Sequence, residues 1–350
     1  MLKKKKLIII GHFGGNENFL DGQTVKTKIL YDELSKDMDW KIIKVDTYYK
    51  SKKPVKLLLC TIKALFSSKY VIVLLSGNGM KFYFPILYFF VKTFHTRVFH
   101  DVIGGNLDTY VKKIPKFKKY LNSFRINWVE TDGLKQKLEA QGIHNCKVIP
   151  NFKRLNCIAS HQLSLPDTQI YRFCTFSRVM KEKGIEDAVK AIRAINKENQ
   201  KMICTLDIYG SVDGAYKEQF DTIIARFSPE IKYCGKVSYE KSVETIKNYY
   251  ALLFPTFWKG EGFPGTIVDA FCAGLPVIAT DWNCNKEIVE NGKNGILYPN
   301  NQISNLKEAI EWLIENKSEM IRFKRNCVNS AKKYQPDKYI KNIIAEISKD

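Results

Sequence analysis

Closely spaced cysteines are missing from this chain of 350 residues. It has nine cysteines, but no two of them are separated by only two residues, as the ligand pairs of many zinc sites are. Their scattered positions also lack the regular pattern of a disulfide framework. We therefore expect reduced and mostly buried thiols, as in a cytosolic protein, and neither a zinc site nor a disulfide framework.

Long apolar runs are missing as well. The apolar run near the N-terminus covers only residues 7–10 and is followed by a glycine, so it predicts a first buried strand and not an export signal. The segment between Lys81 and Lys92 is apolar, but it is much shorter than the ~20 residues of a membrane-spanning helix. A core helix and a helix lying in a membrane interface both fit this segment.

Acidic residues are absent between Thr47 and His100. The net charge of the chain is +20, and residues 1–150 hold 27 Lys and Arg against 12 Asp and Glu. Such a basic N-terminal half can attract nucleic acid or anionic lipid. It contains no recognised nucleic-acid-binding motif, and aromatic residues are interleaved with its lysines, also in residues 112–120. We therefore expect peripheral attachment to an anionic membrane surface and no nucleic-acid partner.

The G-x-G-x-x-G pattern of nicotinamide sites is not present. The first predicted strand is followed by a loop that contains Gly15 and Gly22, where the backbone can approach a phosphate or an acceptor; a plain flexible loop is the alternative. Asp37 and Asp39 have the D-x-D spacing of metal–nucleotide sites, but they fall in a polar turn. Because the sequence shows no other ligand cluster, we predict no metal and no cofactor.

Strand-like and helix-like segments alternate along the chain, which predicts doubly wound parallel sheets of the α/β class. In the first half we expect strands at 7–10, 40–45, 70–75, 97–99, 126–130 and 147–149 and helices at 23–36, 55–66, 82–94, 110–124 and 131–140. After a linker at 156–168 we expect strands at 171–176, 204–209, 231–234, 252–254 and 277–279 and helices from 184, at 215–227, at 239–248 and from 265. Two domains are therefore predicted, residues 1–160 and residues 168–334.

The stretch from Glu261 to residue 281 predicts a loop, a helix and a buried strand. Gly262 and Gly265 suit the turn that follows Glu261, and Asp269 lies about one turn into the helix. The N-terminus of such a helix presents free backbone N–H groups, which suit a phosphate. A carboxylate one turn later can accept hydrogen bonds from the hydroxyls of an attached sugar. This stretch therefore indicates a site for a nucleotide or a sugar phosphate.

Arg178 and Lys183 lie where the strand 171–176 gives way to the helix that begins at Gly184. In open α/β sheets this is the edge at which ligands bind. Each charge-assisted contact with a diphosphate could contribute about 1.5–3 kcal/mol. Two solvated surface cations are the alternative in a chain with 56 Lys and Arg, but the stretch after Glu261 favours the diphosphate site.

His100 and Asp101 follow the predicted strand at 97–99 and precede two glycines. A structural His–Asp pair is one interpretation of this pattern. The position at a strand end favours a functional pair, in which Asp101 orients His100 or accepts a proton from an incoming hydroxyl.

Together these motifs resemble the family 4 glycosyltransferases of the GT-B fold. The resemblance is strong over residues 170–300, where the chain also reads AGLPVIA and EIVENG, and weak in the N-terminal half. It implies two Rossmann-like domains that face each other across a cleft, with residues 335–350 returning to pack on the N-terminal domain. It also implies that the first domain binds the acceptor and the second binds the nucleotide sugar.

The resemblance implies a role for each site residue. Arg178 and Lys183 match the cations on the donor diphosphate, and Glu261 and Asp269 match the two acids of the family's E-x7-E motif, with Asp in place of the second Glu. His100 and Asp101 are expected to line the reacting centre. The other residues expected at the donor are Gly262, Phe263, Gly265, Thr266, Val237 and Gly15, and those on the acceptor side are Gly22 and Gln23.

The expected function is that of a retaining, metal-independent glycosyltransferase. It would move a sugar from a nucleotide sugar, UDP-linked, to a lipid-linked glycan in the synthesis of a surface polysaccharide such as capsule or lipopolysaccharide. The expected location is the cytoplasmic face of the plasma membrane. Two alternatives stay open: a UDP-sugar epimerase of the same fold that acts on a soluble substrate, and a non-catalytic partner that docks a glycosyltransferase to the membrane.

Overall fold

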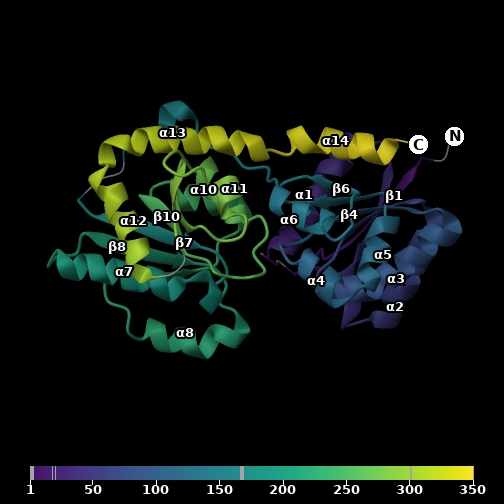
Figure 1. Cartoon of the computed structure of the whole chain (residues 1–350), viewed down its shortest axis with the longest axis horizontal. Coiled ribbons are helices and arrows are strands. Elements are labelled where there is room, and N and C mark those ends of the chain that lie inside the picture. Colours follow the sequence, from purple (N-terminus) through teal and green to yellow (C-terminus); the bar gives the residue numbers. More distant parts are fainter. Residues whose placement is uncertain (1–3, 18, 20, 166–168, 300–301, 350) are drawn as a thin grey trace. The chain divides into compact units, whose positions relative to one another are not determined.

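The computed structural model describes residues 4–17, 19, 21–165, 169–299 and 302–349, and it forms two compact units, shown in Figure 1. Unit 1 contains residues 1–154 and 335–350, and unit 2 contains residues 155–334. The predicted boundary at residue 160 falls within unit 2. The reason is that Leu155 is buried in a core cluster of unit 2, and the backbone N–H of Ile158 donates to the carbonyl of Cys272 at 2.8 Å.

Unit 1 is built on a six-stranded parallel sheet with the order β2-β1-β3-β4-β5-β6. The order of the strands reverses between β1 and β3, because the chain moves to one side for β2 and to the other for β3. The strands are β1 (Lys6–Gly11), β2 (Lys41–Asp46), β3 (Tyr70–Leu74), β4 (Arg97–Asp101), β5 (Ile126–Val129) and β6 (Cys146–Val148). The helices are α1 (Gly22–Asp37), α2 (Pro54–Ser67), α3 (Gly77–Phe94), α4 (Leu107–Lys113), α5 (Lys116–Ser123), α6 (Asp132–Glu139) and α14 (Asp337–Ser348).

Unit 2 contains a second six-stranded parallel sheet with the order β12-β11-β10-β7-β8-β9. Here the order reverses between β7 and β10. The strands are β7 (Tyr171–Phe176), β8 (Cys204–Tyr209), β9 (Ile231–Gly235), β10 (Ala251–Phe254), β11 (Val277–Thr280) and β12 (Gly295–Tyr298). The helices are α7 (Ile185–Glu198), α8 (Lys217–Ile224), α9 (Ser242–Ile246), α10 (Gly265–Cys272), α11 (Asn285–Ile288), α12 (Ile303–Glu315) and α13 (Met320–Ala331).

The predicted fold class, with two doubly wound parallel sheets, is confirmed by these two units. Strands covered by helices on both faces need apolar side chains on both faces. This explains the run from Leu7 to Ile10, whose four side chains are all 0 % exposed. The predicted cleft between the two domains stays a prediction.

Two predicted elements of unit 1 differ from the structure. The predicted helix 110–124 is two helices, α4 and α5, separated at Pro115, because proline has no N–H to donate within a continuing helix. Strand β4 does not end at residue 99 but continues to Asp101, which pairs in register with Trp128. This second difference changes the surroundings of His100, as described below.

The expectation of reduced cysteines is wrong for one pair. Cys157 and Cys272 form a disulfide, with their Cα atoms 4.2 Å apart. The predicted linker is not a free connection, since it runs along the C-terminal end of α10 and brings Cys157 to that helix. The two cysteines are 115 residues apart in the sequence, so their spacing did not indicate the pair. The other seven cysteines are free.

Helix α14 belongs to unit 1 although it comes last in the chain. The ring of Tyr339 stacks on Phe152 at a centroid distance of 5.8 Å. The guanidinium of Arg154 forms ion pairs with Glu33 of α1 at 2.5 Å and with Asp337 of α14 at 2.6 Å.

Among the residues that the structure describes, no helix combines the length and the apolar character needed to cross a membrane.

Candidate functional site

The loops that follow β7 and β10 lie next to each other in unit 2. These two strands are neighbours in the sheet, and the chain leaves them in opposite directions, from β7 toward β8 and from β10 toward β11. In open α/β sheets this reversal opens the crevice in which ligands bind, at the carboxyl ends of the strands. Arg178 and Lys183 follow β7 and Glu261 follows β10, so the topology brings all three to the same edge of the sheet.

Gly184 allows the two loops to lie in direct contact. It follows a short 3-10 turn, Lys181–Lys183, and has a φ of 70°, in the left-handed region that favours glycine. A Cβ atom at this position would lie 2.1 Å from the carbonyl oxygen of Pro255, in the loop after β10. The N–H of Phe257 donates to the carbonyl of Glu182 at 2.8 Å and ties the same two loops together.

Lys183 and Glu261 form a buried ion pair at the centre of this edge. Lys183 Nζ lies 2.5 Å from Glu261 Oε2, and the two side chains are 9 % and 6 % exposed. The hydroxyl of Thr256 donates to the same carboxylate oxygen at 2.8 Å. The ammonium also lies 5.1 Å from the ring centroid of Trp258 and 5.2 Å from that of Phe254, within the range of a cation–π interaction. The pair is therefore held from several sides.

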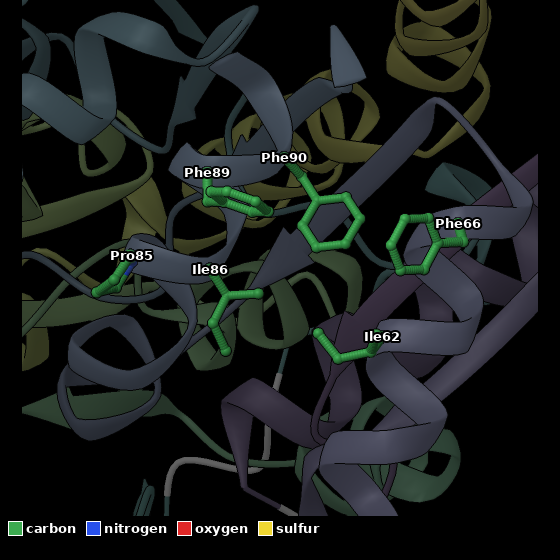
Figure 2. Close-up of a pocket in the computed structure, with 6 residues that line it drawn as sticks. All are labelled: Ile62, Phe66, Pro85, Ile86, Phe89 and Phe90. Atoms are coloured by element: carbon green, nitrogen blue, oxygen red, sulfur yellow. The ribbon is translucent and has the colours of Figure 1, made fainter. Parts of the chain in front are cut away.

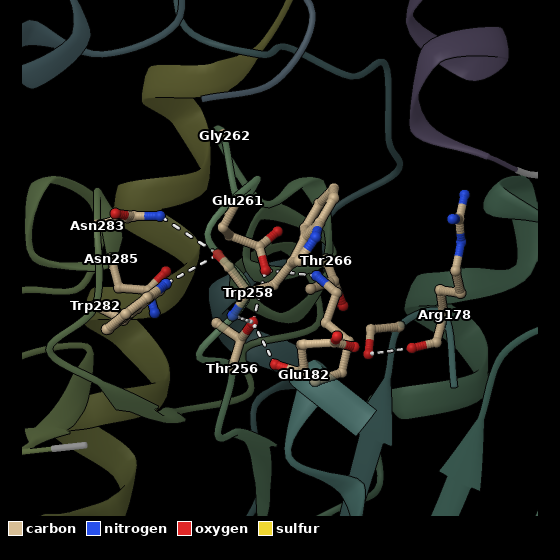
Figure 3. A network of polar contacts seen from close by, with 12 residues as sticks. Arg178, Glu182, Thr256, Trp258, Glu261, Gly262, Thr266, Trp282, Asn283 and Asn285 are labelled. Atoms are coloured by element: carbon tan, nitrogen blue, oxygen red, sulfur yellow. Dashed lines mark hydrogen bonds and ion pairs between the residues drawn. The ribbon is translucent and has the colours of Figure 1, made fainter. Parts of the chain in front are cut away.

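The loop that carries Glu261 is fixed by hydrogen bonds, which Figure 3 shows. The carbonyl of Trp258 accepts from the indole N–H of Trp282 at 2.9 Å and from the amide of Asn283 at 3.4 Å. Its neighbour Thr256 accepts at its carbonyl from the hydroxyl of Thr280 at 2.6 Å. Contacts from β11 and the loop after it therefore hold the loop after β10 in one conformation.

Arg178 is more open than Lys183. Its side chain is 48 % exposed, and its guanidinium lies 3.5 Å from the carboxylate of Asp213, in the loop after β8. In Figure 3 the guanidinium of Arg178 extends away from Glu261. The structure thus places one half-exposed cation and one buried cation at the same sheet edge. Both can neutralise an anion that enters there.

Helix α10 begins beside these cations. The hydroxyl of Thr266 donates to the carbonyl of Phe176, the last residue of β7, at 2.5 Å. This bond joins the N-terminal turn of α10 to the strand that leads to Arg178. The backbone N–H groups of such a turn suit a phosphate. Asp269 lies one turn further on and is 3 % exposed.

The remaining donor residues predicted from the sequence are distributed around this centre. The carbonyl of Gly262 accepts from the thiol of Cys284 at 2.7 Å. Gly265 is the first residue of α10. Phe263 is 7 % exposed, and its ring packs on Tyr334 at a centroid distance of 5.1 Å, so it supports the loop from inside the core. Val237 is half-buried after β9, at the edge of the sheet, and its contact with a nucleobase stays a prediction.

Thr256, Trp258 and Trp282 belong to the site but were missed by the sequence analysis. Thr256 and Trp258 follow β10 directly, in the stretch Phe254-Pro-Thr-Phe-Trp, and therefore lie at a strand end like Arg178. Their position directly after a predicted strand could have identified Thr256 and Trp258 as candidate site residues. Trp282 is recognisable only from the fold, because it reaches the site by packing across from β11.

In unit 1, the structure places His100 inside the core. Its ring is 0 % exposed, because β4 continues through it and helix α3 covers that face of the sheet. His100 Nδ1 lies 3.1 Å from Asn127 Oδ1, and the ring packs edge-on against Phe84 at a centroid distance of 5.1 Å. A ring in this position cannot reach a substrate without opening of the core, and its expected place at the reacting centre stays a prediction.

Asp101 is also buried, at 4 % exposure, and it takes part in an ion-pair cluster. Lys26 Nζ, from α1, lies 2.6 Å from Asp101 Oδ1 and 2.9 Å from Glu130 Oε1, and it donates to the carbonyl of Val102 at 3.0 Å. Burial raises the pKa of Asp101, and the Lys26 ammonium opposes this rise. We therefore interpret Asp101 as a structural partner of Lys26 and not as a base that faces a substrate.

Acid is expected to destabilise unit 1 through His100. Burial lowers the pKa of His100 to about 4, from the ordinary value of about 6.5. The stability contributed by such a group is complete above about pH 6.5 and is lost as the pH falls toward about 4. Relative to the His100→Phe variant, the protein should therefore lose about 2 kcal/mol of unfolding free energy between about pH 7 and about pH 5. Denaturant titrations at the two pH values measure this difference.

Asp101 is present in both the unaltered protein and the His100→Phe variant. Its contribution to the pH dependence of stability therefore cancels when the two proteins are compared. His144→Phe is the matched control, because it makes the same replacement at an exposed histidine. An equal loss of stability in the protein and in His100→Phe would contradict a neutral, buried imidazole.

The glycine loops of unit 1 lie at the sheet edge where the strand order reverses. Gly15 has a φ of 57°, and its N–H donates to the carboxylate of Asp46, at the end of β2, at 2.8 Å. Gly22 is the first residue of α1, and the amide of Gln23 donates to the carbonyl of Leu74, at the end of β3, at 3.2 Å. These loops are in the position for ligand binding, and their roles at the donor and the acceptor stay predictions.

The paired aspartates of the D-x-D spacing are separated in the structure. Asp37 is the last residue of α1, and Asp39 forms an ion pair with Lys4. In the described part of the chain, no group of three or more His, Cys, Asp and Glu side chains is arranged to hold a metal ion.

Comparisons with known proteins place unit 2 in a described family. A family model described as "Glycosyl transferases group 1" matches residues 160–334, half of the chain. The chain is 28 % identical over 201 residues to the UDP-N-acetylglucosamine–peptide N-acetylglucosaminyltransferase GtfA subunit of Streptococcus agalactiae, which covers 57 % of this chain and 34 % of that protein. The chain thus spans less than half the length of the curated relatives it matches first.

Two solved structures share the fold over nearly the whole chain. A sucrose-phosphate synthase from Thermosynechococcus elongatus has a TM-score of 0.77 at 14 % identity, with 98 % of each chain covered. The HepE protein of Anabaena, solved in complex with UDP, has a TM-score of 0.73 at 15 % identity, also with 98 % of each chain covered. At these identities the likeness concerns the fold, which is the two-sheet arrangement described above.

Proposed function

Because this chain belongs to the glycosyl transferases group 1 family, we propose that it transfers a sugar from a UDP-linked donor to a lipid-linked glycan at a membrane surface. The observation that carries the donor half of this proposal is the buried Lys183–Glu261 pair at the point where the strand order of unit 2 reverses. A cation and a carboxylate at this point provide one group for a phosphate and one for sugar hydroxyls.

The donor would lie along the edge formed by β7, β10 and α10. Lys183 and Arg178 would hold the diphosphate, together with backbone N–H groups at the start of α10. Glu261 would accept hydrogen bonds from the sugar hydroxyls. Asp269 would do the same for the ribose hydroxyls. The complex of HepE with UDP, which has the same fold, supports UDP as the nucleotide.

The proposed reaction retains the configuration of the sugar and needs no metal ion. As the bond between the sugar and the diphosphate breaks, negative charge develops on the leaving phosphate. Lys183 is fixed by Glu261, Thr256 and the Trp258 ring, so it would stabilise this charge with little rearrangement. The departing phosphate itself would take the proton of the acceptor hydroxyl, from the same face of the sugar.

The acceptor half of the proposal rests on unit 1. Its surface is basic and carries aromatic side chains among the lysines, which suits the anionic surface of a membrane. A lipid-linked glycan at the cytoplasmic face of the plasma membrane, of the kind from which capsule or lipopolysaccharide is assembled, is the acceptor class that fits this surface. The glycine loops at Gly15 and Gly22 would line the acceptor side.

The donor assignment is tested by the binding of UDP to variants of Asp269. Asp269→Asn removes the charge that accepts the ribose hydroxyls, so the Kd for UDP measured by calorimetry should rise at least about tenfold, or about 1.4 kcal/mol. Asp269→Glu keeps the charge and should bind more tightly than Asp269→Asn. Asp221→Asn, an exposed acid on α8, is the control and should bind UDP normally.

Unchanged UDP affinity in Asp269→Asn would contradict the ribose contact. Absence of UDP binding by the unaltered protein would instead favour a non-catalytic docking role.

Transfer of a radiolabelled sugar from its UDP conjugate into a lipid-extractable product separates the transferase from a UDP-sugar epimerase, which would leave the label in the aqueous phase. A thermal-shift screen with several nucleotide sugars would then identify the donor sugar.

A further inference from the structure

Helices α2 and α3 leave an apolar groove between them on the surface of unit 1. The groove has a volume of about 420 Å³, and it is lined only by Ile62, Phe66, Pro85, Ile86, Phe89 and Phe90. Figure 2 shows the rings of Phe66 and Phe90 next to each other, with Ile62 and Ile86 nearby. The ring centroids of Phe66 and Phe90 are 5.1 Å apart. This groove is not part of the donor site, which lies in unit 2.

The groove continues into exposed apolar side chains on the same two helices. All the large apolar side chains that are exposed in the described part of unit 1 belong to α2 or α3: Val55, Leu58, Leu59, Phe66, Phe82, Phe89 and Phe94. Single exposed apolar residues are normal at a protein surface, but a contiguous group marks an interaction site. The spacing explains the group, because positions 55, 59, 62 and 66 and positions 82, 86 and 89 each fall on one face of their helix.

The charges around the groove have one sign. Lys56 and Lys63 are exposed on α2, and Lys81 and Lys92 are exposed on α3. The sequence has no Asp or Glu from residue 47 to residue 100, so no carboxylate from these helices neutralises them. Lysine is depleted at protein–protein interfaces, whereas lysines beside exposed aromatic rings are typical of surfaces that lie in the headgroup region of a membrane.

We propose that the α2–α3 face inserts into the surface of an anionic phospholipid bilayer, with Phe66, Phe89 and the groove between them taking up the acyl region. The lysines on either side contact the phosphates of the headgroups. This inference deepens the proposed function, on which it rests, since it names the surface that brings unit 1 to a lipid-linked acceptor. It assigns the apolar segment of α3 both a core face, with Phe84 and Leu87, and a membrane face.

The test compares two proteins in a vesicle sedimentation assay. The probes are vesicles of equal parts phosphatidylglycerol and phosphatidylcholine, and vesicles of phosphatidylcholine alone. The Phe66→Ser/Phe89→Ser double variant should bind the anionic vesicles at least about tenfold more weakly than the unaltered protein. Both side chains are more than half exposed, at 63 % and 55 %, so their replacement leaves the core intact. Met202→Ser, at an exposed apolar residue of unit 2, is the matched control and should bind as the unaltered protein does.

Several outcomes would overturn the inference. Equal sedimentation of the double variant and the unaltered protein would exclude the groove as the contact. Equal binding to both kinds of vesicle, unaffected by salt, would exclude the role of the lysines. If the unaltered protein did not sediment with vesicles but associated with itself, and the double variant did not, the face would be assigned to a second copy of the chain. UDP binding is measured on the same samples and should be equal in all of them, so a failure of the donor assignment is seen separately from a failure at the groove.

Discussion

Replacing Lys183 with alanine is expected to lower the turnover of sugar transfer at least about a hundredfold. The ammonium is the buried cation of the proposed donor site, fixed 2.5 Å from Glu261 and packed between aromatic rings. A preorganised cation aimed at developing negative charge contributes more in a water-excluded site than in solvent. A hundredfold loss corresponds to about 2.7 kcal/mol of lost stabilisation of the transition state. Initial rates of transfer from a radiolabelled UDP-sugar measure it.

Lys181→Ala is the matched control for this variant. Lys181 belongs to the same 3-10 turn, but its side chain is exposed, so its loss should leave turnover nearly unchanged. Lys183→Ala also leaves the carboxylate of Glu261 without its cation, and thermal unfolding of each variant must therefore accompany the rates. Arg178→Ala avoids this complication because Arg178 is half exposed, and it should also reduce turnover. Near-normal turnover in both Arg178→Ala and Lys183→Ala would refute the proposed role of the cations.

Replacing Lys26 with methionine is expected to cause the largest loss of stability, about 3–5 kcal/mol for unit 1. Lys26 is 5 % exposed and is the cation between Asp101 and Glu130. The two carboxylates raise the pKa of Lys26 well above its ordinary value, against the effect of burial. Removal of a buried partner leaves uncompensated charge in the core, which costs more than the pair itself contributes. Denaturant unfolding monitored by tryptophan fluorescence, with Trp128 in unit 1, measures the change.

Lys28→Met provides the control, because Lys28 lies on the same helix but is not buried in the cluster, and its replacement should change stability little. The Lys26→Met/Asp101→Asn variant should be more stable than Lys26→Met alone, since it also removes one of the stranded charges. If Lys26→Met were as stable as Lys28→Met, the cluster would not be the structural element described here. If instead Lys26→Met kept its stability and lost activity, Asp101 would regain its predicted place at the reacting centre.

Most of what could be predicted from the sequence concerned the buried strands and the residues that follow them. The uninterrupted apolar run at Leu7–Ile10 identifies a strand buried on both faces, and the alternation of such runs with amphipathic segments gives the parallel sheets. Parallel strands end at the same edge, so Arg178, Lys183 and Glu261 could be assigned to one place before the fold was known. The contact between Lys183 and Glu261 follows from the adjacency of β7 and β10 in the sheet, which the structure shows and the sequence analysis did not predict.

Interactions between distant segments could not be predicted in the same way. The surroundings of His100 depend on two further residues of β4 and on the helix that packs over them, and a strand that ends at residue 99 or at residue 101 has almost the same sequence pattern. Lys26 and Glu130 are 104 residues apart, and each taken alone is an ordinary surface charge. By contrast, the break at Pro115 follows from a local rule and could have been recognised from the sequence, although the prediction of a single helix at 110–124 missed it.

The contact between Gly184 and the carbonyl of Pro255 constrains how this site can vary among relatives. The absence of a Cβ atom at Gly184 permits this close spacing, and the hydrogen bond from Phe257 to Glu182 maintains it. In a homologue with any other residue at this position, one of the two loops would have to move to make room for the Cβ atom. The residue at position 184 therefore offers a simple criterion for deciding, from sequence alone, which relatives can keep the two loops this close.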